Sequence, residues 1–557
     1  MAVFDWAQSI ASYVLYVLMT FLTDVWKERL KDAAAIVNTL DGLTAIMSVG
    51  IAILHDAYIG SYSIILISAL AHITGLGFLA LSVPPTLSKV LGTCHEQKAA
   101  CIGKVQHSLF YMALPAIAVG RAGYENLAPI FWNEQLIDPN NQKISNEKHC
   151  TNLDWINISL WIILLGTYLL SSIESWSVLY GILVVVMVIA TIIFLSGTLS
   201  YKHVKPQGSP LACVVCVFVA ATLKRHLQYP PNTFQLHNPE KVELPLPYTN
   251  RLRFLDKASL IVSPALNDNR SKWRLCTVTE VEESKVVLGM FPMWITFLMC
   301  GVVRSVGDTY FLEQGNNMEN KLGKIRIPIL SFFLLFEVSR VITIKIYSLI
   351  LSSRTQLDQK SSYELRIGVG MLLSVKCCVV AALVETKRLN VLKNCGLQHT
   401  ADTTVPMSVF WLMPQFLLLG AMDGLVKDGI KQFFYDNCPN SIKTYAEPFA
   451  KTAIGVGTIL SIVIVTISNK ASKIGRRHGW FSVKLNQSRL DYFYWTLACL
   501  SFVNLGFYFF VSNRFTSKRR TEEQTFRSNI VVPEQVTFVT VHPTVVPVHP
   551  DNMVIQR

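Results

Sequence analysis

The sequence predicts an all-α, polytopic membrane protein of about 12 transmembrane helices, arranged as two bundles of six. Three observations support this fold class. Hydrophobic residues make up 51% of the chain and charged residues only 16%, whereas soluble globular chains carry about 25% charge. Apolar runs of about 20 residues, the length that crosses a bilayer core, recur along the chain. The recurrence pauses once, in a basic stretch from about Tyr201 to Lys285.

Lipid offers the backbone no hydrogen-bond partner, so each apolar run is expected to be a helix that satisfies its own backbone groups. The expected spans are 8–24, 36–54, 59–83, 108–130, 155–172, 176–198, 286–306, 325–351, 364–385, 404–426, 446–468 and 488–511. The first run has no basic segment before it and no small-residue cleavage site after it. We therefore interpret it as a retained span and not as a signal peptide.

The spans divide the chain into four expected parts. Residues 1–200 form the first six-helix bundle and residues 286–512 the second. Residues 201–285 form a central loop, in which Leu211–His226 is expected to be a helix lying along the membrane surface. Lysine and arginine are frequent in this loop, which favours a cytosolic location. Residues 513–557 are polar and are predicted to be a disordered cytosolic tail.

Composition also indicates which partners to expect. The net charge of +13 is interpreted as a consequence of membrane topology. Basic segments beside a membrane are attracted to anionic lipid by about 1 kcal/mol per Lys or Arg. No basic patch is interleaved with aromatic residues, so no nucleic-acid partner is expected. The pair Cys213-Val-Val-Cys216 lacks the further ligands of a metal site, and packing is the favoured interpretation. No nucleophile and base are arranged as in an enzyme, so no catalytic activity is expected.

Five strings are more specific than hydropathy. They are RFLDKAS (253–259), WRLCTVTEVEE (273–283), VPMSVFWLMPQFLLLGAMD (405–423), QFFYDNCPNSIK (432–443) and LNQSRLDYFYWTLA (485–498). In this order they resemble the plant nitrate/peptide transporter family, a group of proton-coupled oligopeptide transporters within the major facilitator superfamily. The resemblance runs from about Tyr13 to Phe515. It implies two six-helix bundles around a central cavity, alternating access, and a location in the plasma or vacuolar membrane.

The chain departs from the family at residues tied to coupling and binding. The ExxER motif of the first span, associated with proton coupling, falls on Phe4, Ala7 and Gln8, none of which titrates. A lysine that is frequent on the fourth span is replaced by Glu125, which has the opposite charge. The glutamate of the LEFFYD motif becomes Gln432. The resemblance implies a proton as the coupling ion and no other cofactor, and these departures predict that the coupling is weakened or rerouted.

Charged residues remain inside the spans, where each costs about 2.5–3.5 kcal/mol on insertion scales. Most of them are spaced three or four residues apart, so that both members share one helix face. The candidate ion pairs are Arg121–Glu125, Arg304–Asp308, Glu337–Arg340, Asp423–Lys427 and Glu447–Lys451. One interpretation is that same-helix pairing lets a polar face be buried at low cost. The other is that the pairs line a water-filled cavity and exchange partners during transport.

Four residues are the best candidates for lining that cavity, namely Arg304, Glu125, Asp423 and Lys376. The resemblance places Arg304 where nitrate-carrying relatives can hold a histidine facing the anion. A guanidinium keeps its charge and offers a planar fork to nitrate or carboxylate. Lys376 has no same-helix partner, and pairing with Glu337 is its alternative. For Asp41 the sequence favours a capping or packing role.

The resulting hypothesis is a multi-pass carrier of a small polar or anionic solute, with nitrate, a di- or tripeptide, or an organic metabolite as the candidates that the resemblance implies. Its expected partners are that solute and the lipid bilayer. The loss of several motif residues at once leaves an alternative, in which a carrier-like protein no longer transports and acts as a sensor or interaction partner.

Overall fold

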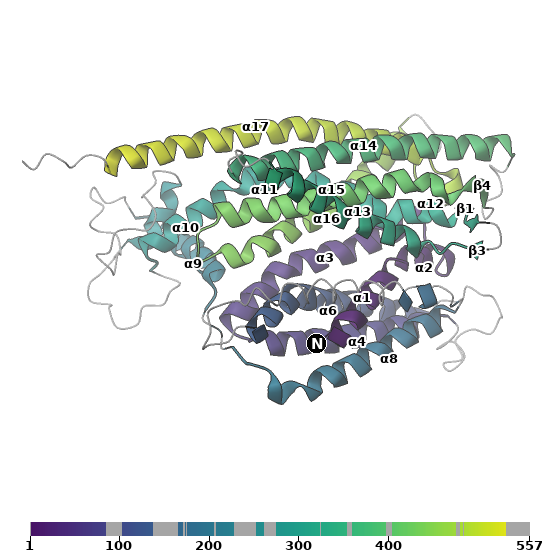
Figure 1. The fold of residues 1–557 in the computed structure, drawn as a ribbon, viewed down its shortest axis with the longest axis horizontal. Coiled ribbons are helices and arrows are strands. Elements are labelled where there is room, and N and C mark those ends of the chain that lie inside the picture. The colour runs from purple at the N-terminus through teal and green to yellow at the C-terminus, as the bar shows by residue number, and fades with distance from the viewer. Residues whose placement is uncertain are drawn as a thin grey trace, which may run out of the picture. The chain divides into compact units, whose positions relative to one another are not determined.

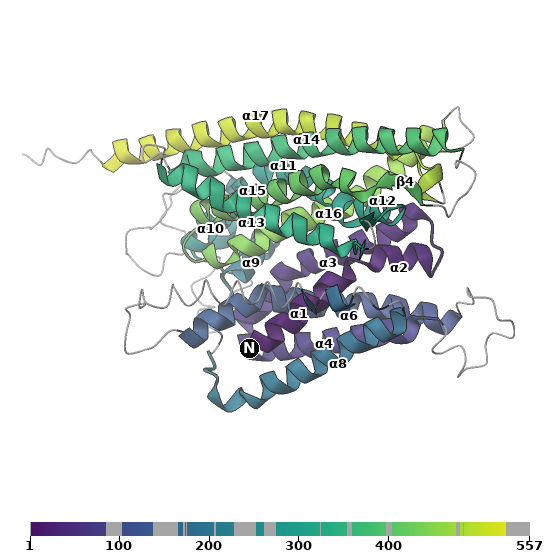
Figure 2. The same cartoon turned by 45° about the vertical axis from the view of Figure 1, so that its right-hand side comes forward.

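The computed structural model describes residues 2–84, 103–136, 165–227, 252–260, 275–353, 359–396, 404–474 and 479–530, apart from positions 167, 171, 172, 174, 205, 207, 323, 324 and 483. Met1–Ser512 form one compact unit, and Asn513–Arg557 form a second. Within the described part of the first unit, long helices run side by side (Figures 1 and 2). Eight described helical segments are long and apolar enough to cross a membrane.

The N-terminal bundle is built from α1 (Ala2–Leu15), α2 (Leu18–Asp24), α3 (Leu30–Ala57), α4 (Ser61–Ser82), α6 (Lys104–Leu136) and α8 (Trp176–Ser196), followed by η1 (Thr198–Ser200). α1 and α2 occupy the first predicted span, and a turn between them contains Tyr16. α4 packs against α6 and α8. The fifth predicted span, 155–172, lies largely outside the described residues.

The C-terminal bundle is built from α11 (Phe291–Val306), η5 (Gly307–Phe311), α12 (Leu312–Asn316), α13 (Leu330–Ser353), α14 (Gln359–Asn394), η7 (Val409–Leu412), α15 (Met413–Asn437), η8 (Lys443–Tyr445), α16 (Ala446–Lys473), η9 (Leu485–Gln487) and α17 (Leu490–Ile530). The seventh span was predicted to end at residue 306. Instead η5, a π-helix, joins α11 to α12 and carries the helix on to Asn316. Isolated π-helical turns inside α-helices are frequent at functional sites.

Strands are few and short among the described residues. β1 (Met318–Glu319) pairs in parallel with β4 (Val405–Ser408), and β2 (Lys321–Leu322) pairs antiparallel with β3 (Ile325–Arg326). They follow α12 and precede η7, so they only connect helices. The prediction of an all-α fold is confirmed.

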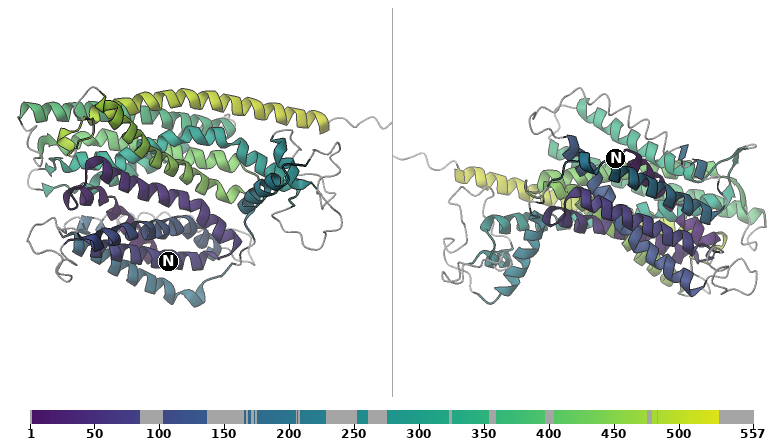
Figure 3. Two further views of the ribbon diagram at one scale, coloured as in Figure 1. Left: turned by 180° about the vertical axis from the view of Figure 1, so that it is seen from behind. Right: turned by 90° about the horizontal axis from the view of Figure 1, so that it is seen from below.

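The central stretch folds into a small helical module of α9 (Pro210–Leu223), η3 (Arg253–Ser259) and α10 (Val278–Gly289). Apolar side chains from the three helices share one buried core, which includes Cys216, Leu255 and Cys276. The module lies at one end of the long helices, as the view from behind in Figure 3 also shows. A capping box of Thr277 and Glu280 starts α10. The strings RFLDKAS and TEVEE thus have a structural role in this core.

The two bundles meet where α3 packs against α16. Small residues allow this close approach. A Cβ atom at Gly42 of α3 would lie 2.9 Å from the carbonyl oxygen of Gly455 on α16, and a Cβ atom at Gly455 would collide with Ala45. The close crossing brings Asp41 and Glu447, which flank it, to the same cavity.

The tail differs from its prediction where the structure describes it. α17 continues to Ile530, so Asn513–Ile530 are helical, whereas the sequence predicts disorder from residue 513. Neither proline nor glycine interrupts this stretch, and the helix formers Lys, Arg, Glu and Gln are frequent in it. Residues 531–557 lie outside the described part of the chain.

Candidate functional site

A cavity of about 350 Å³ lies between the two bundles. Tyr16, α3 and α6 line it from the N-terminal bundle, and α11, η5, α13, α15 and α16 line it from the C-terminal bundle. Its charged lining residues are Asp41, Arg121, Glu125, Arg304, Asp308, Arg340, Lys427, Asp428, Lys431, Glu447 and Lys451. Ligand cavities are ordinarily lined by apolar side chains with few polar groups. The density of charge therefore favours a charged solute.

The N-terminal face of the cavity is built on Arg121 of α6. Its Nη1 donates to Asp41 Oδ1 of α3 at 2.8 Å, and its Nε lies 3.5 Å from Glu125 Oε1 one turn along α6. One cation thus neutralises only one of the two carboxylates. Asp41 was not predicted to belong to the site, because its partner is on another helix and spacing along one helix cannot reveal it.

A proline in α6 creates a link between the bundles. Pro129 lies inside the helix and has no N–H, so the carbonyl of Glu125, four residues earlier, loses its usual helical partner. Lys451 Nζ of α16 donates to this carbonyl oxygen at 3.0 Å and to Asn126 Oδ1 at 3.1 Å. The vacated backbone acceptor is therefore satisfied by a cation from the opposite bundle.

The C-terminal face is built on Arg304, which lies between two carboxylates. Its Nη1 lies 2.6 Å from Asp423 Oδ1 of α15, and its Nε donates to Asp308 Oδ2 of η5 at 3.3 Å. Lys427 Nζ lies 3.2 Å from the other oxygen of Asp423. The guanidinium also faces the ring of Phe336 at 4.7 Å. Buried charges are tolerated only when they are paired in this way.

Each of the five predicted same-helix pairs lies within ion-pair distance in the structure. The nitrogen–oxygen distances are 3.5 Å for Arg121–Glu125, 3.3 Å for Arg304–Asp308, 2.5 Å for Arg340–Glu337, 3.2 Å for Lys427–Asp423 and 3.3 Å for Lys451–Glu447. Eight of these ten residues line the cavity, and Asp423 and Glu337 do not. Exchange of partners during transport stays a prediction.

The structure places the four candidate binding residues differently. Arg304 and Glu125 line the cavity. Asp423 is buried behind Arg304 and holds it in place. Lys376 requires a correction, because it is exposed on α14 and does not line the cavity, while its neighbours Cys377 and Cys378 face inward. A lysine in an apolar span need not face the interior, since its long side chain can extend along the helix surface.

Three further residues, Tyr16, Asp428 and Lys431, line the cavity but were not among the predicted binding candidates. Tyr16 lies in the turn between α1 and α2, where its ring stacks on Phe333 of α13 at a centroid distance of 4.1 Å. Asp428 forms an ion pair with Arg366 of α14. For Tyr16 the sequence allowed a cavity-lining position but favoured packing, because an aromatic residue in a span ordinarily packs or anchors at the interface. Asp428 has its partner on another helix, so spacing along one helix did not reveal it. Among the described residues, no cluster of His, Cys, Asp and Glu is arranged to hold a metal ion.

The positions of the missing ExxER motif are occupied by neutral groups. Gln8 of α1 is buried, and its Oε1 accepts a hydrogen bond from His72 Nδ1 of α4 at 2.9 Å. Phe4 stacks on Phe194. Packing and a neutral hydrogen bond therefore replace the titrating groups at these positions.

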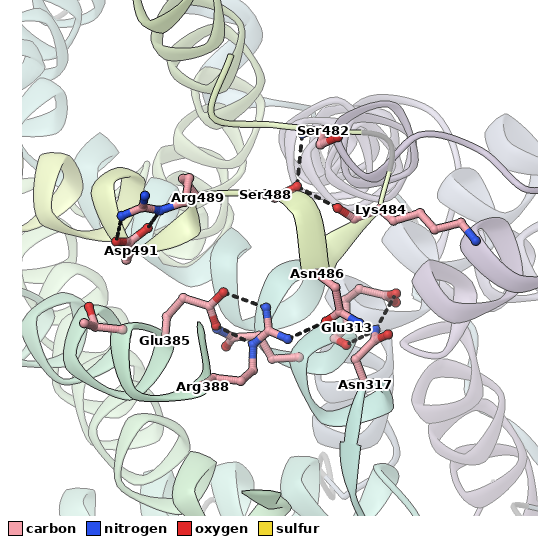
Figure 4. Close-up of polar contacts among 12 residues, drawn as sticks. Glu313, Asn317, Glu385, Arg388, Ser482, Lys484, Asn486, Ser488, Arg489 and Asp491 are labelled. Carbon is pink, nitrogen blue, oxygen red and sulfur yellow. Dashed lines mark hydrogen bonds and ion pairs between the residues drawn. The ribbon is translucent and has the colours of Figure 1, made fainter. Parts of the chain in front are cut away.

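A second buried polar group joins α14 to η9 within the C-terminal bundle (Figure 4). Arg388 of α14 donates to both carboxylate oxygens of Glu385 at 2.8 Å and to Asn486 Oδ1 of η9 at 2.7 Å. Gln314 of α12 donates to Glu385 at 2.6 Å. The ninth span was predicted to end at residue 385, so this pair was missed, although its three-residue spacing resembles that of Glu337–Arg340. Through Asn486, the pair Glu385–Arg388 holds η9 against the last part of α14.

Hydrogen bonds join the bundles on both sides of the cavity. Beyond one end, Thr23 of α2 donates to Glu313 Oε2 at 3.2 Å. Beyond the other, the hydroxyl of Tyr445 in η8 donates to Asp56 Oδ2 of α3 at 2.6 Å and lies 2.7 Å from Ser209 Oγ at the start of α9. Each end of the cavity therefore carries a hydrogen-bonded link between the bundles.

The fold and the charged cavity can be compared with known proteins. A family model described as the POT family, PTR2, matches residues 62–481. The chain belongs to the POT family. This family member is 35% identical over 525 residues to Protein NRT1/ PTR FAMILY 5.5 of Arabidopsis thaliana, a match that covers 93% of this chain and 96% of that protein. The resemblance to the plant nitrate/peptide transporter family is thereby confirmed.

Solved structures support the fold of this POT family member. An auto inhibited POT family peptide transporter matches with a TM-score of 0.60 at 16% identity, covering 92% of this chain and 96% of that chain. A POT family transporter in complex with 5-aminolevulinic acid matches with a TM-score of 0.57 at 10% identity, covering 92% and 96%. These likenesses confirm the predicted arrangement of two helical bundles. The protein is thus a multi-pass membrane protein of a transporter family.

Proposed function

We propose that this POT family member carries a small charged solute across its membrane by alternating access. The observation that carries the proposal is the cavity between the bundles, where charged residues of both bundles meet. The position of this cavity between two separately linked ends suits a carrier whose bundles rock around a central site. Nitrate, a short peptide and a charged organic metabolite remain the candidate solutes.

Proton coupling is proposed to be weak or to run through another carboxylate. Gln8, bonded to His72, occupies a position where the family motif titrates. Glu125 and Asp308 are the alternatives, because both line the cavity and both are paired with an arginine that could release them. A proton that neutralises either carboxylate would free its arginine for a solute anion.

The test is uptake and efflux of labelled nitrate and a labelled dipeptide in cells that express the chain, at acidic and at neutral external pH. We expect flux above that of control cells, and we expect Arg304→Gln to abolish it. Lys376→Gln is the matched control, because it removes a cation of the same bundle that is exposed outside the cavity. Absence of flux in either direction for a chain that reaches the membrane contradicts the proposal.

The pH dependence separates the two forms of coupling. Flux that does not change with the external pH supports facilitated transport. Flux that rises at acidic pH, and loses this rise in Glu125→Gln or Asp308→Asn, supports rerouted coupling and identifies the carboxylate.

A further inference from the structure

Lys376 lies at the centre of the apolar part of α14. Between Arg366 and Glu385 the helix has 18 residues, and Lys376 is the only charged one among them, with nine before it and eight after it. At 1.5 Å per residue, each end of this apolar run is about 12–14 Å from Lys376. The four-carbon stem of a lysine covers only about half of that distance, so the amine does not reach the membrane surface.

Lys376 belongs to a stripe of exposed side chains along α14. Leu365, Val369, Leu372 and Leu383 are 53%, 37%, 41% and 57% exposed, and Lys376 between them is exposed as well. Their spacing of three, four and seven residues places them on one face of the helix, which we call the α14 stripe. At the depth of the apolar run, an exposed side chain contacts lipid. The amine of Lys376 is therefore surrounded by hydrocarbon when the stripe is uncovered.

The chain itself supplies no counter-charge that the structure describes. Among the described residues, none forms an ion pair or a hydrogen bond with the amine of Lys376. Glu337, the partner that the sequence offered, pairs with Arg340 on its own helix. Lipid does not supply the anion either, because phosphate groups stay outside the hydrocarbon core. Charged groups at this depth are ordinarily paired with other protein groups.

We propose that the α14 stripe binds a membrane-spanning helix of a different protein, and that this helix carries a carboxylate at mid-membrane opposite Lys376. In lipid, apolar surface alone gives helices little mutual attraction, because the lipid tails are equally apolar, and polar side chains hold helices together instead. The apolar residues of the stripe give the partner a surface to pack against, and Lys376 fixes its depth. The stripe lies outside the central cavity, so this inference is independent of the solute.

A second copy of this chain fits the stripe less well. If it presents its own stripe, two lysines face each other at the same depth. Its other surfaces offer no better match, because every Asp and Glu in the described parts of the eight membrane-crossing helices is buried or half-buried. The required carboxylate therefore comes from another protein.

The test uses model helices of known sequence. The purified full-length protein is placed in phosphatidylcholine vesicles with a synthetic helix of about 20 Leu and Ala residues, which lacks tryptophan, carries Glu at its centre and has a dansyl group at one end. Energy transfer from the tryptophans of the protein to the dansyl group measures binding. The same helix with Gln or Leu at its centre is the comparison. We expect the Glu helix to bind about fivefold or more tightly than either, which is the effect of one polar contact between membrane helices.

Substitutions in α14 then assign the contact. Lys376→Gln should remove the preference for the Glu helix, and Lys376→Glu should transfer the preference to a helix with Lys at its centre. Lys387→Gln is the matched control, because Lys387 is an exposed lysine of the same helix but lies about three turns further along it. It should keep the preference. A photoreactive benzoylphenylalanine beside the central Glu is expected to attach to α14 between Leu365 and Leu383.

Three results overturn the inference. The first is equal binding of the Glu, Gln and Leu helices, the second is a preference for Glu that persists in Lys376→Gln, and the third is attachment of the photoreactive group to helices other than α14. Binding of the Lys-centred helix by Lys376→Glu shows that a loss in Lys376→Gln is not caused by misfolding. Chemical cross-linking of the protein alone tests self-association. If dimers form in the vesicles and Lys376→Gln dissociates them, the occupant is a second copy and the assignment to a different protein is wrong.

Discussion

At the residue scale, the C-terminal face of the site depends on Arg304 and Asp423, each of which has two charged partners. Arg304 separates Asp308 from Asp423, and Lys427 approaches Asp423 from the other side. Such an arrangement gives Asp423 two cationic partners and does not fix it to a single one. We therefore expect release of one contact to a solute to cost less free energy than it would in an isolated pair.

The first prediction concerns Arg304. Its replacement by Gln leaves Asp308 and Asp423 buried with one cation fewer, and breaking a buried pair in this way costs about 3–5 kcal/mol. We expect Arg304→Gln to lower the thermal midpoint of the purified protein and to abolish flux. Arg304→Gln combined with Asp423→Asn should regain most of the midpoint without regaining flux, because the stranded charge is gone but the binding cation is not restored. Recovery of flux in the double variant would show that Arg304 only balances Asp423.

At the scale of elements, interruptions of regular helix position the site. η5 is a π-helical turn at Asp308, and Pro129 leaves a carbonyl of α6 free for Lys451.

Most spans could be predicted from the sequence, because a helix that crosses lipid requires a long apolar run. The same-helix pairs could also be predicted, because residues three or four apart along a helix lie on one face. The sequence could not predict Asp41–Arg121 or Arg304–Asp423, since contacts between helices depend on packing. Nor could it exclude Lys376, whose orientation is set by which side of α14 its bundle buries.

The second prediction tests the link across Pro129. Lys451→Met removes the donor to the Glu125 carbonyl oxygen, and an unsatisfied buried acceptor costs about 1–3 kcal/mol. In a Pro129→Ala background the residue at 129 supplies an N–H that satisfies this carbonyl within α6. We therefore expect Lys451→Met to lower the thermal midpoint clearly in the natural sequence and less in the Pro129→Ala background. Equal losses in both backgrounds would mean that the side chain pair with Glu447, and not the carbonyl, carries the effect.

The third prediction concerns the central module of α9, η3 and α10. Burial raises the pKa of the Cys276 thiol to about 12, whereas a thiol in an unfolded chain has a pKa of about 8.5. Near pH 8.5 the folded module therefore holds about a thousandfold less thiolate at Cys276 than an unfolded one. We expect iodoacetamide at this pH to modify the exposed Cys395 quickly and Cys276 only after unfolding.

Peptide mapping after alkylation follows both cysteines in one sample, so Cys395 serves as the internal standard. Because the raised pKa stabilises the neutral thiol, the contribution of Cys276 to stability is complete below about 8.5 and is lost as the pH rises toward 12. Rapid labelling of Cys276 in the folded protein would mean that the module opens on its own.

At the scale of the whole transporter unit, a hydrogen-bonded link joins the bundles at each end of the cavity. Thr23–Glu313 holds one end, and Tyr445 with Asp56 and Ser209 holds the other. Tyr445 is buried at the start of α16, so a single hydroxyl connects α3, α9 and the C-terminal bundle. The central module is thus joined to the part of the molecule that has to move if the bundles rock. Weakening one end should shift the population toward the state that opens there.

The fourth prediction measures that shift. Tyr445→Phe keeps the ring and removes the hydroxyl, and a hydrogen bond to a charged group contributes about 1.5–3 kcal/mol, so the state open at the α9 end should become about tenfold more populated. An engineered thiol at the cavity-lining Ala450, Ala450→Cys, reports this state through its alkylation rate. Tyr435→Phe is the matched control, because Tyr435 is an exposed tyrosine of α15 whose ring contact with Lys443 survives the change.

Glu313→Gln weakens the link at the opposite end of the cavity. It should slow the alkylation of the engineered thiol, since it favours the state that is open at the other end. If Tyr445→Phe and Tyr435→Phe label alike, the hydroxyl does not hold the α9 end closed, and the packing of α3 against α16 at Gly42 and Gly455 must supply that closure instead.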